Sequence, residues 1–245
     1  VFQHSLGGIF WWFGERTFAA DTPGIARIAW NGREFLRAYG TFSHPNVLGG
    51  FLAVTLLLLL QTKKRTWFII TTIGLGIIAL ITTFSRSAWT VGLVAMVITL
   101  AKIKNKKLLL LLLCIVLVFL LSIINPREES VVVRQQLNSS ALTLWQQSPL
   151  VGVGLGNFLV RLPQVLASRQ IYFLHPVHNI YLLVLTETGF IGLLVLFLFL
   201  KRTVKKITIS LIALLLLGFV DHYPLTLQQG QLLFTLFLAL STILP

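Results

Sequence analysis

The chain has 245 residues, of which 56% are hydrophobic and only 11% are charged. A soluble domain carries about 25% charged residues, so the composition excludes a soluble globular protein and indicates an integral membrane protein. The net charge of +13 could suggest nucleic acid, but the basic residues form short clusters between apolar stretches, as in membrane proteins, so we expect no nucleic-acid partner.

Residues 1–45 form a polar and aromatic segment before the first apolar stretch. Phe10, Trp11, Trp12 and Phe13 are consecutive aromatic residues, and such rings favour the bilayer interface. We therefore predict an extracytoplasmic or interfacial segment. Because the chain begins with valine and its only methionine is Met96, we also expect that some N-terminal sequence is missing.

Seven apolar stretches follow, and a spanning helix needs about 20 apolar residues. We predict an all-α, polytopic transmembrane bundle of about seven spans, with four in residues 46–124 and three in residues 179–245. The stretches are 46–61, 66–84, 87–101, 108–124, 179–200, 207–220 and 231–244.

Lysines set the predicted orientation of these spans. All of them lie in three loops, at 63–64, 102–107 and 201–206, which fall on one side if every stretch crosses the bilayer. The positive-inside rule makes that side cytoplasmic. The opposite, extracytoplasmic side receives arginines, histidines and acids but no lysine, and arginine is the side chain that grips phosphate with a planar fork.

The long loop 125–178 is predicted to be extracytoplasmic and helical. Residues 131–147 read as an amphipathic helix with Arg134, Asn138, Ala141 and Trp145 on one face, ended by Ser148-Pro149. The segment "PLVGVGLGNF" (149–158) carries glycines as G-x-G-x-G. Without a surrounding βαβ unit this is not a dinucleotide fingerprint, and we expect a tight backbone corner between two loop helices.

The segment "HPVHNIYLL" (175–183) places two histidines before the fifth apolar stretch. His178 and Asn179 open the predicted helix, where unpaired N–H groups and the helix dipole attract phosphate. The same dipole lowers a histidine pKa and favours the neutral imidazole of a general base. The alternative is that His178 only caps the helix or lies at the headgroup level.

A zinc site is a further alternative for these histidines. It would use His175, His178 and either Asp221 or His222. Pro176 keeps His175 out of a regular helix, and the chain has no H-E-x-x-H pattern. We therefore expect no metal and no cofactor.

Three positions in the fifth span are predicted to be structural. Glu187 lies nine residues after His178, too far along the helix axis and on the wrong side to orient it. We expect Glu187 to pair with another helix or to cap a local break. Gly189 and Gly192 would form a small-residue face that allows close helix packing.

Arg86, in the turn "FSRSAW" (84–89), and Arg134 are the candidate phosphate ligands. The alternatives are that Arg86 snorkels to lipid head groups and that Arg134 is a solvated loop charge. Further candidate substrate-binding residues on the same side are Asn179, His175, His44, Arg161, Asp221 and His222.

His178-Asn179, nine residues, and then Gly189-x-x-Gly192 resemble the H-[NSQ]-x9-G-x-x-[G/T/Y] signature of the O-antigen ligase and O-antigen polymerase superfamily. Four further segments resemble that superfamily in the same order. They are "TFSHPNVLGGFL" (41–52), "FSRSAW" (84–89), "SPLVGVGLGNF" (148–158) and "DHYPLTLQQGQ" (221–231). The resemblance covers residues 41–240, and because the family's members have more spans, this chain would be their C-terminal portion.

The resemblance implies a multi-pass enzyme of the bacterial plasma membrane with its active site on the extracytoplasmic face. Such an enzyme transfers a glycan from an undecaprenyl-pyrophosphate carrier to an acceptor, which could be lipid A-core, a growing glycan or a protein. The essential histidine would be His178, with Arg86 and Arg134 as the arginines, and inverting transfer would need neither metal nor nucleotide. A polymerase of the same superfamily and a non-enzymatic flippase or transporter remain alternatives.

Overall fold

The computed structural model describes residues 4–15, 17–19, 21–30, 33–64, 66–100, 129–166 and 174–243. The chain divides into two compact units, residues 1–109 and 110–245. Each unit is described by itself. Helices make up most of the described residues, as predicted.

The first unit contains one short helix, a β-hairpin and three apolar helices. Their bounds are α1 (Ile9–Trp12), β1 (Arg27–Trp30), β2 (Arg33–Leu36), α2 (Pro45–Gln61), α3 (Trp67–Thr82) and α4 (Arg86–Leu100). The antiparallel hairpin β1–β2 is a correction to the all-α prediction. Its sequence signal is the dipeptide Asn31-Gly32 between the strands, which is typical of two-residue hairpin loops.

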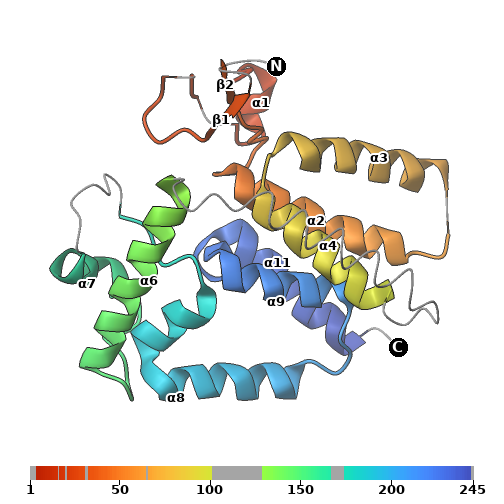
Figure 1. The fold of residues 1–245 in the computed structure, drawn as a ribbon. Helices are drawn as coiled ribbons and strands as arrows, with labels where there is room; N and C mark the ends of the chain where they lie inside the picture. Colours follow the sequence, from red (N-terminus) through yellow and green to blue (C-terminus); the bar gives the residue numbers. More distant parts are fainter. Residues whose placement is uncertain are drawn as a thin grey trace. The chain divides into compact units, whose positions relative to one another are not determined.

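Helices α2, α3 and α4 lie side by side in this unit (Figure 1). Small residues bring α2 and α4 together, because a Cβ atom on Gly49 would lie 3.1 Å from the Cβ of Ala88 in α4. At one end Arg37 joins two of these helices. Its Nε donates to the carbonyl of Thr83 (2.8 Å), at the end of α3, and its Nη2 donates to Oδ1 of Asn46 (2.7 Å) in α2.

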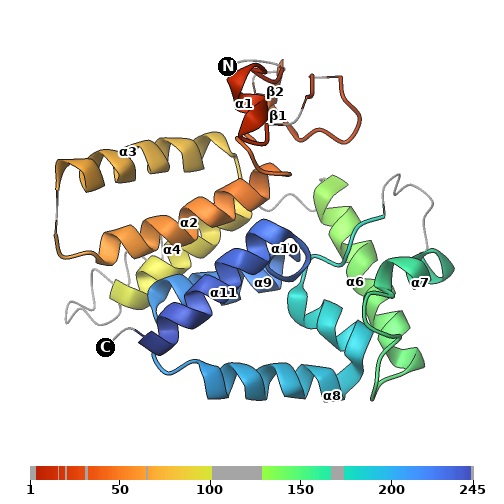
Figure 2. The same ribbon diagram turned by 180° about the vertical axis from the view of Figure 1, so that it is seen from behind.

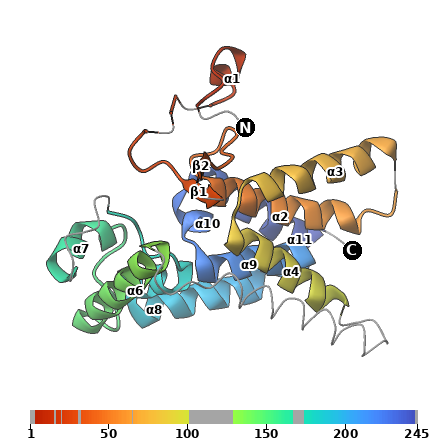
Figure 3. The same ribbon diagram turned by 45° about the horizontal axis from the view of Figure 1, so that its top comes forward.

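The second unit is helical throughout its described residues. Its elements are α6 (Glu129–Gln147), α7 (Phe158–Val165), α8 (Ile180–Thr203), α9 (Ile209–Val220), α10 (Tyr223–Thr226) and α11 (Gln228–Ile243). Helix α9 and the α10–α11 pair lie against each other in Figure 2. Figure 3 shows α7 beside α6 and the start of α8.

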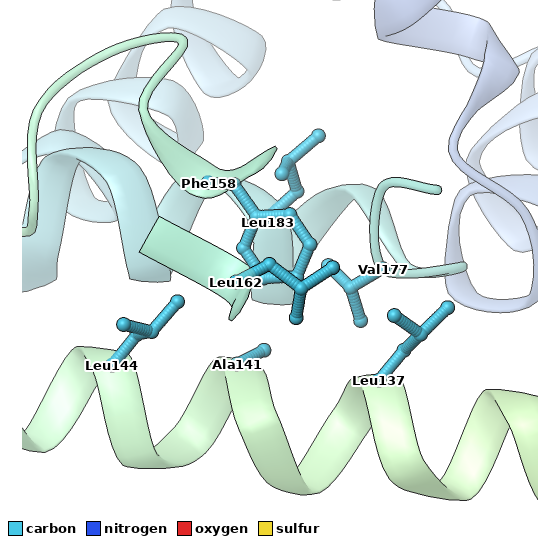
Figure 4. Packing of buried hydrophobic residues seen from close by; sticks show 7 residues of the cluster. All are labelled: Leu137, Ala141, Leu144, Phe158, Leu162, Val177 and Leu183. Carbon is cyan, nitrogen blue, oxygen red and sulfur yellow. The ribbon is translucent and has the colours of Figure 1, made fainter. Parts of the chain in front are cut away.

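A buried apolar cluster holds α6, α7 and the start of α8 together. Its members are Leu137, Ala141, Leu144, Phe158, Leu162, Val177 and Leu183 (Figure 4). Leu137, Ala141 and Leu144 recur at helical spacing and form the inner face of α6. The predicted helix is therefore confirmed, and on its predicted face Ala141 is buried whereas Asn138 is exposed.

Helix α8 is broken at Gly189, and the ribbon of α8 is bent in Figure 1. Gly189 has φ 67° and ψ −169°, a region that is essentially restricted to glycine. The predicted role of Gly189 in helix packing is corrected accordingly, and that of Gly192 stays a prediction. Gly189 ends one helical segment and starts another, and it meets the backbone of Leu150 and Val151 instead of a neighbouring helix.

The break at Gly189 interrupts the hydrogen bonds within α8. The glycine-rich loop 149–156 supplies other backbone partners for the groups of α8 on either side of the break. Gly152, Gly154 and Gly156 all have positive φ, so the predicted tight corner between two helices is confirmed. Four hydrogen bonds join the loop to α8: Val153 N to Thr186 O (2.9 Å), Gly154 N to Glu187 O (2.9 Å), Phe190 N to Pro149 O (2.9 Å) and Ile191 N to Leu150 O (3.1 Å).

Among the described residues, one helix, Ile180–Thr203, is long and apolar enough to cross a membrane. Four shorter apolar helices coincide with predicted spans: Pro45–Gln61, Trp67–Thr82, Arg86–Val97 and Ile209–Val220. The predicted span 108–124 lies outside the described residues. The count of seven spans stays a prediction.

Candidate functional site

His178 lies two residues before the first turn of α8, at a sharply defined helix start. Asn179 is the N-cap, and its Oδ1 accepts hydrogen bonds from the N–H groups of Tyr181 and Leu182 (both 2.9 Å). Next to His178 on the other side, Val177 is buried in the apolar cluster. The imidazole is therefore held between a capped helix and a buried anchor.

Asp221 and His222, which follow the last residue of α9, meet His178 at this point. One ligand atom from each of the three side chains lies within 4.8 Å of the others. The rings of His178 and His222 are 5.2 Å apart in an edge-to-face arrangement. Gly218 allows this approach, because a Cβ atom there would lie 2.5 Å from Cδ1 of Ile180.

His222 is fixed by its own helix start. Its Nδ1 lies 2.6 Å from Oγ1 of Thr226, and its backbone N–H donates to Oδ1 of Asp221 (2.8 Å). The Asp221 carboxylate is buried. These contacts engage Nδ1, one of the two ring nitrogens of His222.

Arg134 of α6 adds a permanent positive charge to the cluster. Its Nη1 donates to the carbonyl of Val220 (2.8 Å), the last residue of α9. A helix C-terminus carries partial negative charge, which favours a guanidinium there. Arg134 is half-buried on the side of α6 that carries Leu137 and Ala141, which argues against a solvated loop charge.

Burial and neighbouring charges keep both imidazoles neutral. Burial, followed by the charges of Arg134, His222 and His175, lowers the pKa of His178 from 6.5 to about 3. Burial also lowers the pKa of His222, although the Asp221 carboxylate acts in the opposite direction. Nδ1 of His178 is buried and has no hydrogen-bond partner among the described residues, which is typical of a group that binds a ligand or water.

Four residues were considered for a zinc site, and three of them, His178, Asp221 and His222, lie close together. His175 is exposed. Tetrahedral zinc with bonds of about 2.0–2.1 Å needs ligand atoms about 3.3 Å apart, so the cluster would have to contract. The charge of Arg134 opposes a cation at this place, whereas the buried Asp221 carboxylate favours one. The expectation of a metal-free site therefore stays a prediction.

The structure describes four further predicted residues within their own units. Arg86 is the first residue of α4, and His44 is the N-cap of α2, where its Nδ1 accepts from Asn46 N (3.1 Å); both belong to the first unit. Arg161 is exposed on α7. Glu187 accepts a hydrogen bond from the N–H of Phe158 (3.2 Å) at the start of α7.

Sequence reasoning did not single out Tyr223 or Thr226. Thr226 orients His222, as described above. The Tyr223 hydroxyl is buried without a hydrogen-bond partner among the described residues, and burial together with Asp221 raises its pKa well above 10. A sequence signal for these two residues is the segment "DHYPLT", in which polar side chains precede a proline at the start of a short helix.

We expect a characteristic pH dependence from the low pKa of His178. Between about pH 3 and pH 6.5 the unfolded chain binds a proton at this histidine that the folded protein does not bind. Acidification through this window therefore destabilises the fold. At the same time, kcat/KM should show no acid limb from His178 down to about pH 5, because the imidazole is already neutral.

The measurements are thermal unfolding and kcat/KM at several pH values. In His178→Ala, whose side chain cannot titrate, the unfolding midpoint should depend less on pH in this window than in the wild-type protein. An acid limb in kcat/KM near pH 6.5 that is assigned to His178 by labelling would contradict the expectation.

The apolar helices, and a polar cluster in which the Arg134 guanidinium lies with neutral imidazoles and the buried Asp221 carboxylate, are typical of an integral membrane protein with a polar site. The sequence model of the O-antigen ligase family matches residues 70–197. This match covers 128 of the 245 residues, and the chain belongs to this family. The matched part includes Arg134, His178 and Gly189 and ends before Asp221. No curated protein matches the chain.

Proposed function

We propose that this protein transfers a glycan from a polyprenyl diphosphate, of the undecaprenyl type, to an acceptor hydroxyl at the extracytoplasmic face of the plasma membrane. Membership of the O-antigen ligase family supports a membrane enzyme of O-antigen processing. The observation that carries the proposal is the neutral, buried His178 beside the guanidinium of Arg134. This pairing combines a proton acceptor with an anion-binding group, which are the two functions that the reaction needs.

The chemical step is a single displacement at the anomeric carbon. The acceptor oxygen forms a bond to this carbon while the bond from the carbon to the diphosphate oxygen breaks. The electron pair leaves with the polyprenyl diphosphate, and the acceptor proton passes to an imidazole nitrogen of His178. One displacement inverts the configuration at the anomeric carbon.

The low pKa of His178 fits this step once the donor is bound. In the free protein the positive charge of Arg134 weakens the imidazole as a base. A diphosphate next to Arg134 offsets that charge, and its own negative charge favours a protonated imidazole, so the pKa of His178 rises. His178 would therefore become an effective base only in the complex with the donor.

Arg134 is better placed than the start of α8 to bind the diphosphate. Asn179 already accepts hydrogen bonds from two of the first N–H groups of α8, so fewer donors remain for a phosphate than a bare helix start offers. By contrast, the described contacts of Arg134 use one of its five N–H donors. Arg86 is kept as a second diphosphate ligand in this proposal, on the basis of the family resemblance.

Replacing Arg134 by lysine should lower kcat by about 10²-fold, because the lysine ammonium lacks the planar fork of donors that can bind Val220 and the diphosphate in one fixed geometry. The measurement is transfer of a labelled glycan by purified protein in vesicles. Arg202→Lys is the matched control, since Arg202 is exposed in the last turn of α8, and its activity should be close to that of the wild-type protein. Equal activity in Arg134→Lys would show that bidentate binding is not needed.

The proposal is tested by reconstitution in the presence of EDTA and without nucleotide. Lipid A-core, a second lipid-linked repeat and an acceptor protein are supplied in parallel with the lipid-linked donor. We expect transfer to one of the three acceptors, which separates ligase, polymerase and protein-transferase activities. Donor that moves across the bilayer without being consumed would instead identify a transporter and overturn the proposal.

A further inference from the structure

The glycine-rich loop 149–156 carries apolar side chains on its surface. Leu150, Val151 and Leu155 are 65%, 64% and 82% exposed, and no residue between Ser148 and Phe158 is charged. Such a loop in water would expose its apolar groups at a cost of about 25 cal/mol per Å². The exposed side chains of the loop therefore favour an apolar environment over water.

The loop is continuous with the apolar surface of α8. Phe190 and Ile191 donate their N–H groups to Pro149 and Leu150, so the loop backbone lies directly against the helix. The exposed face of α8 after the break is also apolar, and its members are Phe190, Ile191, Leu194, Val195, Phe197, Leu198 and Phe199. Loop and helix together form one apolar surface within the same unit.

Helix length places this surface within the bilayer. Lys201 and Arg202 occupy the last turn of α8 and mark the polar boundary at that end. From Phe190 to Leu200 the helix rises only about 16 Å, whereas the hydrocarbon layer is about 30 Å thick. The hydrocarbon layer must therefore extend past Gly189, to the level of the loop and beyond it.

The backbone groups next to the break at Gly189 are hydrogen-bonded within the protein, as a position in the hydrocarbon layer requires. A non-helical segment is tolerated in the hydrocarbon region only where its backbone groups are paired within the protein. The four hydrogen bonds between the loop and α8 provide this pairing for the groups of α8 that flank Gly189, from Thr186 to Ile191. In a loop exposed to water the solvent could have provided it.

We infer that loop 149–156 is a membrane-embedded element whose Leu150, Val151 and Leu155 contact lipid acyl chains in the leaflet at the N-terminal end of α8. The hydrogen bonds on both sides of Gly189 hold the helix segment that follows His178 against this loop.

The test uses the intact protein with its single cysteine replaced (Cys114→Ser) and one reporter cysteine introduced. Val151→Cys and Leu155→Cys are each labelled with a bimane fluorophore, and the protein is reconstituted in phosphatidylcholine–phosphatidylglycerol vesicles. Quenching by doxyl-labelled lipid is compared with quenching by aqueous iodide. Both positions are exposed, so the substitutions should not disturb packing.

Two control positions calibrate the result. Leu198→Cys, on the apolar face of α8, should be quenched by the doxyl lipid, and Ser139→Cys, exposed on α6, should be quenched by iodide. We expect both loop positions to lose most of their fluorescence to the doxyl lipid, as Leu198→Cys does. If either loop position follows Ser139→Cys and is quenched by iodide, the loop lies in water and the inference is overturned.

Discussion

His178→Ala is expected to reduce transfer by about 10²–10⁴-fold, the usual contribution of a positioned general base, while the protein stays folded. The side chain is half-buried next to His222, Asp221 and Arg134, and its Nδ1 makes no hydrogen bond within the described residues. Its loss therefore removes no hydrogen bond of Nδ1 within that part of the chain. The measurement is kcat for glycan transfer in vesicles, together with thermal unfolding.

His175→Ala is the matched control, because His175 lies three residues earlier but is exposed. It should keep nearly full activity. A second variant, His222→Ala, separates the roles of the two buried rings: we expect a smaller loss than for His178→Ala if His222 only positions substrate or His178. Full activity in His178→Ala would remove the base from the proposed mechanism.

Gly189→Ala is expected to have the largest effect on stability. The φ of 67° and ψ of −169° at this position cost a non-glycine residue about 1–3 kcal/mol. An added Cβ atom would also collide with the carbonyl of Leu150. We expect the thermal unfolding midpoint in detergent to fall by at least about 4 °C and transfer activity to fall with it.

Gly74→Ala is the matched control for this substitution. Gly74 lies within α3, and a Cβ atom there would meet nothing within 4 Å. Alanine is favoured over glycine in a helix by about 1 kcal/mol, so this variant should be as stable as the wild-type protein or more so. If Gly189→Ala behaves like Gly74→Ala, the break in α8 is not a requirement of the fold.

Several features of this protein could be predicted from the sequence because they depend on local patterns. Composition indicates a membrane protein, and helical periodicity with Ser148-Pro149 defines the helix that ends at Gln147. Three glycines in five residues predict the corner at Gly152–Gly156. The residue types of His178-Asn179 predict a helix start, and Asn179 is its N-cap.

The composition of the site was decided by tertiary structure. His178 and Asp221 are 43 positions apart, and nothing in local periodicity indicates that α8 and α9 place them together. Arg134 is held near them by a hydrogen bond to the carbonyl of Val220. Because every residue has such a carbonyl, the sequence does not indicate this partner. The break at Gly189 was likewise hidden, since a glycine in an apolar helix reads as a packing position until its backbone partners are known.

Local sequence therefore determined the class of the protein, its helices and the residue types from which a site could be built. Tertiary structure decided which of these residues meet, where α8 breaks and which atoms satisfy the break. The physical reason is the range of the interactions. Periodicity, capping and turn chemistry act over a few neighbouring residues, whereas burial, charge and backbone pairing depend on groups that only the folded chain brings together.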